Sequence, residues 1–169
     1  RETFRGEDSV RVHPIITKGG QLVNIVPAEV CMETSVRARQ PDAMFDAAEK
    51  VDRSLRAAAM AIGCQVEIET VPGNLPLRND PALTELFREN VEQVLGDNTY
   101  RQYPHESGST DAGDLSQLIP VLHPFMAGAQ GDAHSCDWHI ADHDDGYVAP
   151  AKTLAAMAID LLCDNAACG

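Results

Sequence analysis

Three short segments of this 169-residue chain hold the residue types that ligand binding and hydrolysis use. In the first, residues 19–37, a Gly-Gly turn precedes Asn24, and Arg37 follows thirteen residues after that Asn. An amide and a guanidinium that face one cleft suit a carboxylate ligand, because the guanidinium fork can bind both oxygens. A structural interpretation is also open, in which Asn24 satisfies the backbone at a strand end and Arg37 is a solvated sheet residue.

The second segment has the sequence GSTDAGDLS over residues 108–116. Its small residues allow close approach of the backbone to a ligand, and its hydroxyl and carboxylate groups offer donors and acceptors. The residues that offer them are Ser109, Thr110, Asp111 and Asp114. A loop that caps a short helix has the same composition, so this alternative also stays open.

The third segment, residues 131–145, contains His134, His139 and His143 among five aspartates. Imidazole and carboxylate groups are ordinary zinc ligands. The spacing differs from the i, i+4 histidine pair of a helical zinc site, so at most one or two of these histidines could share a metal without long-range partners. The alternative is that they are surface histidines in an acidic loop.

Alternating and β-branched patterns predict the strands that position the first segment. A helix is predicted from Pro41 to Ile62, because apolar residues recur at three- and four-residue steps and Gly63 follows as a stop signal. The strand order around this helix predicts an antiparallel sheet covered by helices on one face. The predicted strands are residues 10–17, 21–26, 30–38 and 64–71.

The rest of the chain is predicted to be richer in helix. Residues 72–81 are dense in Pro, Gly and Asn and indicate a linker, so the predicted domains are residues 1–71 and 72–169. The fold class is therefore α/β, with an antiparallel α+β portion followed by a second α/β portion. The further predicted elements are helices at residues 81–95, 111–118 and 150–162, a buried strand at 119–126 and a long loop at 127–148.

The amino-acid composition narrows the classes of binding partner and the cellular compartment. The formal net charge of -13 argues against nucleic acid and anionic membrane as partners, because phosphates would be repelled. No apolar run reaches membrane-spanning length. The five cysteines contain no C-x-x-C pair, which fits reduced thiols in a cytoplasmic protein.

Taken in order, the three segments resemble the zinc-dependent amidohydrolases that include aminoacylases, carboxypeptidases, aminobenzoyl-glutamate hydrolases and auxin-conjugate hydrolases. The lid domain of that family carries a G-G-x-x-x-N-x-[IV]-P segment before a strand that ends in Arg. Its catalytic domain has a G-[ST]-[TS]-D-x-G-D motif and, later, one metal-binding His before the last helix. The matching residues here are Gly19, Gly20, Asn24, Pro27, Arg37, 108–114 and His134.

The resemblance implies metal-assisted hydrolysis of an amide bond in an N-acyl amino acid or a small peptide-like substrate. It implies one or two zinc ions, with His134 as a ligand, and a homodimer formed through the lid. His13, which precedes the Gly-Gly turn, is a candidate for stabilising the oxyanion. The implied substrate-binding residues are Asn24, Arg37, Thr110 and Asp111.

The same resemblance places most metal ligands and the general base of the family in an N-terminal half that precedes the lid. We therefore expect this chain to be a C-terminal fragment that is inactive alone and that holds no zinc tightly. The alternative is a non-catalytic dimerising or binding module.

Overall fold

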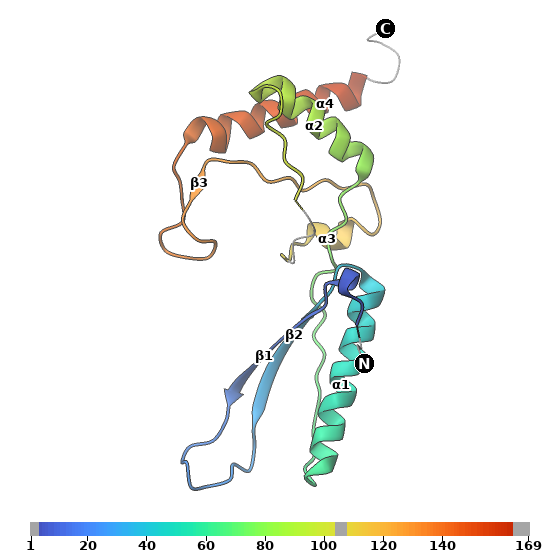
Figure 1. Ribbon diagram of the computed structural model, residues 1–169, viewed down its shortest axis with the longest axis vertical. Helices are drawn as coiled ribbons and strands as arrows, with labels where there is room; N and C mark the ends of the chain where they lie inside the picture. Colours follow the sequence, from blue (N-terminus) through green and yellow to red (C-terminus); the bar gives the residue numbers. More distant parts are fainter. Residues whose placement is uncertain (1–3, 104–107, 164–169) are drawn as a thin grey trace. The chain divides into compact units, whose positions relative to one another are not determined.

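The computed structural model describes residues 4–103 and 108–163, which divide into two compact units (Figure 1). The first unit contains residues 4–76 and 108–114, and the second contains residues 77–103 and 115–163. Helices and small antiparallel sheets confirm the predicted mixed α/β class. The predicted domain boundary after residue 71 stays a prediction.

The first unit is built on a β-hairpin and one long helix. After a short 3-10 helix, Gly6–Asp8, strand β1 (Arg11–Lys18) pairs antiparallel with β2 (Cys31–Arg37). The register runs from Arg11 opposite Arg37 to Lys18 opposite Cys31. Helix α1 (Pro41–Ala61) begins with a proline at its first turn, where the missing N–H costs nothing, and packs along β2 (Figure 1).

Two of the predicted strands in this unit are wrong. Residues 21–26 belong to the loop between β1 and β2, where the Ile25 N–H bonds to the Leu22 carbonyl at 3.3 Å in a tight turn. Residues 64–71 form no strand, although they alternate as a strand does. They return alongside α1 in Figure 1, without a ladder partner among the described residues. An alternating pattern indicates an extended segment, but only a hydrogen-bonded neighbour makes it a strand.

Helices α2 (Pro81–Leu95) and α4 (Ala149–Cys163) pack together in the second unit. The Asp80 carboxylate caps α2 by accepting the Ala82 and Leu83 N–H groups at 2.9 and 3.0 Å. Asn90 is buried between the helices and donates to the Leu86 carbonyl at 3.0 Å and to Asp160 at 2.8 Å. The core contains Phe87, Val91 and Met157, flanked by Leu86, Tyr100, Leu122 and Met126.

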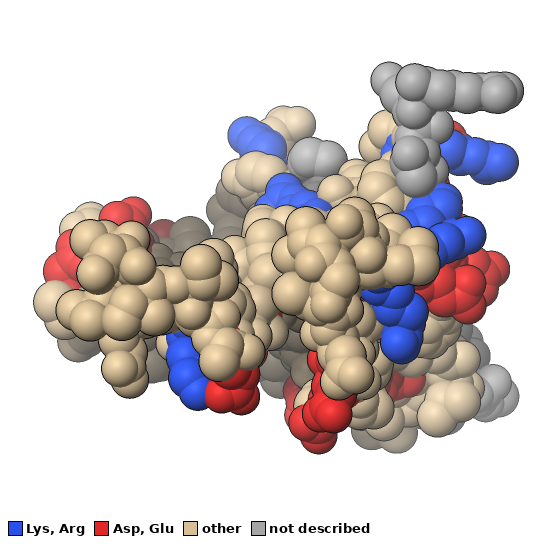
Figure 2. Space-filling model, turned by 90° about the horizontal axis from the view of Figure 1, so that it is seen from below, with Lys and Arg blue, Asp and Glu red and all other residues tan. Residues whose placement is uncertain are grey.

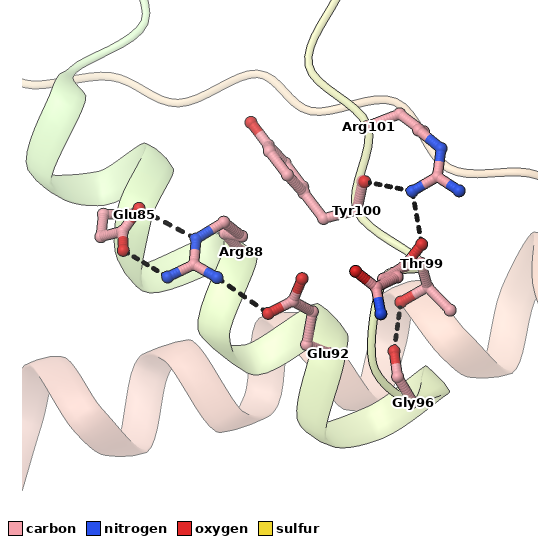
Figure 3. A network of polar contacts seen from close by, with 8 residues as sticks. Glu85, Arg88, Glu92, Gly96, Thr99, Tyr100 and Arg101 are labelled. Atoms are coloured by element: carbon pink, nitrogen blue, oxygen red, sulfur yellow. Dashed lines mark hydrogen bonds and ion pairs between the residues drawn. The ribbon is translucent and has the colours of Figure 1, made fainter.

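The outer face of α2 carries ion pairs between side chains one helical turn apart. Arg88 binds Glu85 on one side and Glu92 on the other, as Figure 3 shows. The segment that follows α2 folds back, with Thr99 bonded to the Gly96 carbonyl at 2.7 Å. Exposed pairs of this kind contribute about 0.3–0.5 kcal/mol each, so the core beneath them does more to hold α2 in place.

The predicted buried strand at residues 119–126 is also wrong. The segment is tied to the start of α2 instead, because the Asp80 N–H bonds to the Val121 carbonyl at 2.7 Å and the His123 N–H bonds to Asn79 at 2.9 Å. Prolines 120 and 124 lack the N–H groups that a ladder requires. The predicted helix at 111–118 is shorter, as α3 (Ala112–Leu115).

The predicted loop at residues 127–148 contains a small hairpin and a helical turn. Strands β3 (Ala129–Gln130) and β4 (His139–Ile140) pair antiparallel, and a π-helical turn, Asp144–Val148, leads into α4. The last helical segment therefore begins before Pro150, which was its predicted first residue. By length and composition, residues 144–163 could cross a membrane, although the core helix of a water-soluble protein passes the same test. The absence of a membrane partner stays a prediction.

Candidate functional site

A cavity of about 150 Å³ lies in the first unit, where four segments meet. Its walls come from the end of β2 (residues 35–38), from Met44 at the start of α1, from residues 73–76 and from residues 108–109. The first and last of these contain predicted site residues or their direct neighbours. The fold thus brings together two of the sequence segments that indicated chemistry.

Arg37 is the last residue of β2, and this position places it at the cavity. The residue that follows it is tightly packed. The Nε of Arg37 donates to the Ser35 hydroxyl at 3.4 Å, and Ala38 beside it is buried. The backbone that carries the guanidinium is therefore held by the ladder on one side and by packing on the other. A guanidinium in a concave site is well suited to a carboxylate.

The loop before α3 contributes Gly108 and Ser109 to the cavity, whereas Thr110 and Asp111 do not line it. Thr110 and Asp111 both accept the Ala112 N–H, at 3.3 and 3.1 Å, so they cap the short helix. Their geometry matches the structural interpretation of this segment. Their predicted binding role stays a prediction.

A hydrogen-bonded link joins this loop to residues 74–75. Asp114 accepts the Leu75 N–H at 2.8 Å through Oδ1 and faces the Asn74 Nδ2 at 3.4 Å through Oδ2. The Ser109 hydroxyl lies 3.4 Å from the Asn74 Oδ1. The sequence analysis missed Asn74, because its PGNLP context indicates a turn and its partners lie 35 and 40 residues away.

The hairpin separates Asn24 from Arg37. Asn24 lies in the loop beyond the Lys18–Cys31 end of the ladder, while Arg37 lies at the opposite end, so the two do not face one cleft in this unit. His13 is exposed on β1, opposite Ser35, which lines the cavity. The predicted roles of Asn24 and His13 stay predictions.

His134 lies in the turn between β3 and β4 of the second unit, with a φ of 66°. This left-handed backbone is uncommon for a residue other than glycine. The surrounding loop is folded tightly, because a Cβ on Gly128 would lie 2.5 Å from the Gly146 nitrogen, and one on Gly131 would lie 2.6 Å from the Asp137 carbonyl oxygen. The loop therefore holds His134 in a strained conformation.

The neighbouring histidines are engaged in other contacts. His139 Nδ1 lies 2.7 Å from the Asp137 carbonyl, and the His143 ring packs against Tyr147 at 5.6 Å. Across residues 4–103 and 108–163, no group of three or more His, Cys, Asp or Glu side chains is placed to hold a metal ion. The described residues therefore do not form a complete zinc site.

No family model matches the chain. It is 30% identical over 165 residues to an Xaa-Arg dipeptidase of Homo sapiens and 29% identical over 162 residues to an Xaa-Arg dipeptidase of Mus musculus. It is also 27% identical over 147 residues to the uncharacterized hydrolase y4tI of Sinorhizobium fredii. These matches cover 85–90% of this chain and 36–37% of the relatives.

The chain is a distant relative of hydrolases that include dipeptidases. It spans little more than a third of the length of these relatives. A peptidase must recognise the charged or polar ends of a peptide as well as the scissile bond, and a buried or concave cation is one way to recognise a carboxylate end. In the first unit, the cavity at Arg37 places a cation in a concave site.

Proposed function

We propose that this chain forms the part of an amide hydrolase that binds the carboxylate end of an N-acyl amino acid or small peptide-like substrate. The observation that carries this proposal is the cavity that brings Arg37 beside Gly108 and Ser109. The two segments are more than 70 residues apart in sequence and belong to separate motifs. The names of the relatives, hydrolase and dipeptidase, support the same class of reaction.

The dimensions of the cavity favour one end of a ligand over a whole ligand. Sites that enclose a complete small molecule have volumes of about 300–1,000 Å³, which exceeds the 150 Å³ found here. A carboxylate would pair with the Arg37 guanidinium, and the glycine at position 108 would let the backbone approach it closely. The reacting amide would then lie at the open side of the cavity.

The proposed reaction in the whole enzyme depends on zinc, which would polarise the amide carbonyl and lower the pKa of an attacking water. His134 is proposed to provide one ligand. Because the described residues do not form a complete site, we assign no catalytic step to them.

A titration of this chain with zinc, monitored by calorimetry, is expected to show no tight stoichiometric binding. The variant His134→Ala is expected to give the same result. Tight binding of one equivalent by the wild-type chain would contradict this expectation.

Carboxylate binding is tested directly by NMR titration of the chain with N-acetylalanine and with its primary amide. The carboxylate is expected to perturb the resonances of Arg37 and Ser109, whereas the amide, which lacks the charge, is expected to bind at least about tenfold more weakly. Arg37→Ala is expected to abolish the difference. Arg39→Ala is the matched control, because this exposed arginine lies two residues on and does not line the cavity. Equal binding of the two ligands by the wild-type chain would refute the proposal.

We also propose that the chain forms a homodimer through the hairpin of the first unit. The loop of residues 19–30 exposes Val23 fully and Val26 by 91%, and most of the face seen in Figure 2 is uncharged. The occupant best suited to this surface is a second copy, because β1 and β2 each present an open backbone edge among the described residues.

Light scattering coupled to size exclusion is expected to show a dimer for the wild-type chain. A double change, Val23→Glu and Val26→Glu, is expected to give a monomer, whereas Met60→Glu on α1, also at an exposed apolar position, is the control. A wild-type monomer at high concentration would contradict the proposal. A dimer that binds no carboxylate would favour the alternative of a non-catalytic dimerising module.

A further inference from the structure

Asp114, Asn74 and Ser109 are joined by a chain of hydrogen bonds. The donor of each bond follows from which groups can donate a proton. A carboxylate offers only acceptors. One oxygen of Asp114 accepts the Leu75 N–H at 2.8 Å, which holds the carboxylate against this backbone, and the other faces the side chain of Asn74 at 3.4 Å. The group of Asn74 that faces Asp114 must therefore be its NH₂.

This orientation of Asn74 decides the role of Ser109. With the NH₂ group directed at Asp114, the carbonyl oxygen of Asn74 is the group that lies 3.4 Å from the Ser109 hydroxyl. An amide oxygen cannot donate, so the hydroxyl proton of Ser109 must point to Asn74. The lone pairs of the Ser109 oxygen remain for a ligand in the cavity that Ser109 shares with Arg37.

We propose that Asn74 and Asp114 are positioning residues that make Ser109 a hydrogen-bond acceptor beside Arg37, so that the cavity selects carboxylates that carry an adjacent N–H group. This inference rests on the proposed carboxylate site and adds a selectivity to it. In an N-acyl amino acid, one carbon atom separates the carboxylate from the amide N–H. The carboxylate would pair with Arg37 while the N–H donates to Ser109.

The selectivity is expected to act against esters. An O-acyl hydroxy acid has the same shape and charge but carries an oxygen in place of the N–H. Its lone pairs would face those of Ser109, so that one acceptor loses its partner and two acceptors oppose each other. A neutral hydrogen bond at an accessible site corresponds to a preference of about three- to tenfold.

NMR titration of the full 169-residue chain with N-acetylalanine and with O-acetyl-lactate tests this preference. The wild-type chain is expected to bind N-acetylalanine about three- to tenfold more tightly. Asn74→Leu frees the hydroxyl of Ser109 to rotate and to donate. The preference is then expected to fall to about one, with O-acetyl-lactate binding retained. Asn74 is exposed, so the substitution is not expected to disturb folding, which circular dichroism checks.

Asp114→Asn provides a sharper test because it reverses the direction of the link. The new amide would still accept the Leu75 N–H through its oxygen and would turn its own NH₂ toward Asn74. Asn74 would then have to rotate and donate to Ser109, whose proton would become available to the ligand. The preference is expected to disappear or to change in favour of the ester. A role limited to folding would weaken both ligands equally and leave their ratio unchanged.

Asp97→Asn is the matched control, because Asp97 is exposed in the second unit and does not line the cavity. It is expected to keep the wild-type preference. Equal binding of the two ligands by the wild-type chain, or an unchanged ratio in Asn74→Leu or Asp114→Asn, would overturn the positioning role while leaving the carboxylate site intact. If neither ligand bound, or if Arg37→Ala had no effect on binding, the proposed carboxylate site would fail and the positioning role with it.

Discussion

The two units of this chain bury their apolar side chains to different extents. In the described part of the first unit, the only buried apolar side chains are those of Ala38 and Ala47. The second unit buries Phe87, Val91 and Met157 between α2 and α4. Burial of a large apolar side chain stabilises a fold by about 1.5–3 kcal/mol. The second unit therefore has a core of its own, whereas the first relies on its hairpin ladder and on α1.

This difference suits the proposed roles of the units. A hairpin that exposes Ile16 by 68% and Val26 by 91% has apolar surface available for a second copy. A unit with its own core can hold a glycine-rich loop in a strained conformation, as the loop around His134 requires. Three pairs of substitutions, each with one member in each unit, test whether the two units differ in this way, and a fourth test examines an ion pair of the hairpin alone.

The largest expected effect is that of truncating a core aromatic. Phe87→Ala is expected to lower the free energy of unfolding by about 3–5 kcal/mol, because it removes buried contacts and leaves a cavity. Phe45→Ala on α1 is expected to cost less than about 1 kcal/mol, since Phe45 is 55% exposed. Urea unfolding followed by the fluorescence of Trp138 and by circular dichroism measures both. Similar costs at the two sites would refute the difference between the units.

Glycine substitutions give the next largest effect. Gly128 has a φ of 103°, and an added Cβ would lie 2.5 Å from the Gly146 backbone, so Gly128→Ala is expected to cost about 3 kcal/mol. Gly63 also has a positive φ, of 72°, but no atom lies within 4 Å of its added Cβ. Gly63→Ala is therefore expected to cost only about 1 kcal/mol. Thermal unfolding of both variants decides whether packing adds to backbone strain at Gly128.

A smaller effect is expected for the buried amide that joins α2 and α4. Asn90→Ala removes the bonds to the Leu86 carbonyl and to Asp160 and is expected to cost about 2 kcal/mol. Asn24→Ala in the exposed loop of the hairpin is expected to change the stability by less than about 0.5 kcal/mol. A cost at position 24 as large as that at position 90 would show that the loop is packed against another surface in solution.

The smallest effect is expected for the exposed pair of Lys18 and Glu29 near the end of the hairpin. The hydrogen bond and charge of Lys18 lower the pKa of Glu29 from 4.5, and Glu29 raises the pKa of Lys18 from 10.5. Glu29 therefore stabilises the fold above its ordinary pKa and loses this contribution as the pH falls. Lys18 contributes below its ordinary pKa and loses its contribution as the pH rises.

The pair is thus expected to act between about pH 4.5 and 10.5 and to weaken with added salt, because both groups are exposed. NMR titration of the Glu29 carboxyl carbon measures the lowered pKa, and the titration of Lys18 in Glu29→Gln is the control. An unshifted Glu29 at low salt would show that the pair does not form in solution.

The local sequence was sufficient to predict the long helices. Pro41 and Gly63 bracket α1, Asp80 and Gly96 bracket α2, and apolar residues recur at helical spacing between them. These signals act within one or two turns of the chain, so no distant contact is needed to interpret them. The strands predicted at 10–17 and 30–38 match β1 and β2 to within one residue at each end, because their alternation is local and the structure supplies each with the other as a ladder partner.

Tertiary structure alone decided which of the other extended segments became strands and which side chains meet at the cavity. Residues 21–26 and 64–71 have the composition of strands but no ladder partner among the described residues, and a strand is defined by that partner. Arg37 was singled out from the sequence and lines the cavity, whereas the predicted Thr110 and Asp111 do not line it. The sequence analysis could not place Asn74 between Asp114 and Ser109, because hydrogen bonds over 35 and 40 residues depend on the folded path of the chain.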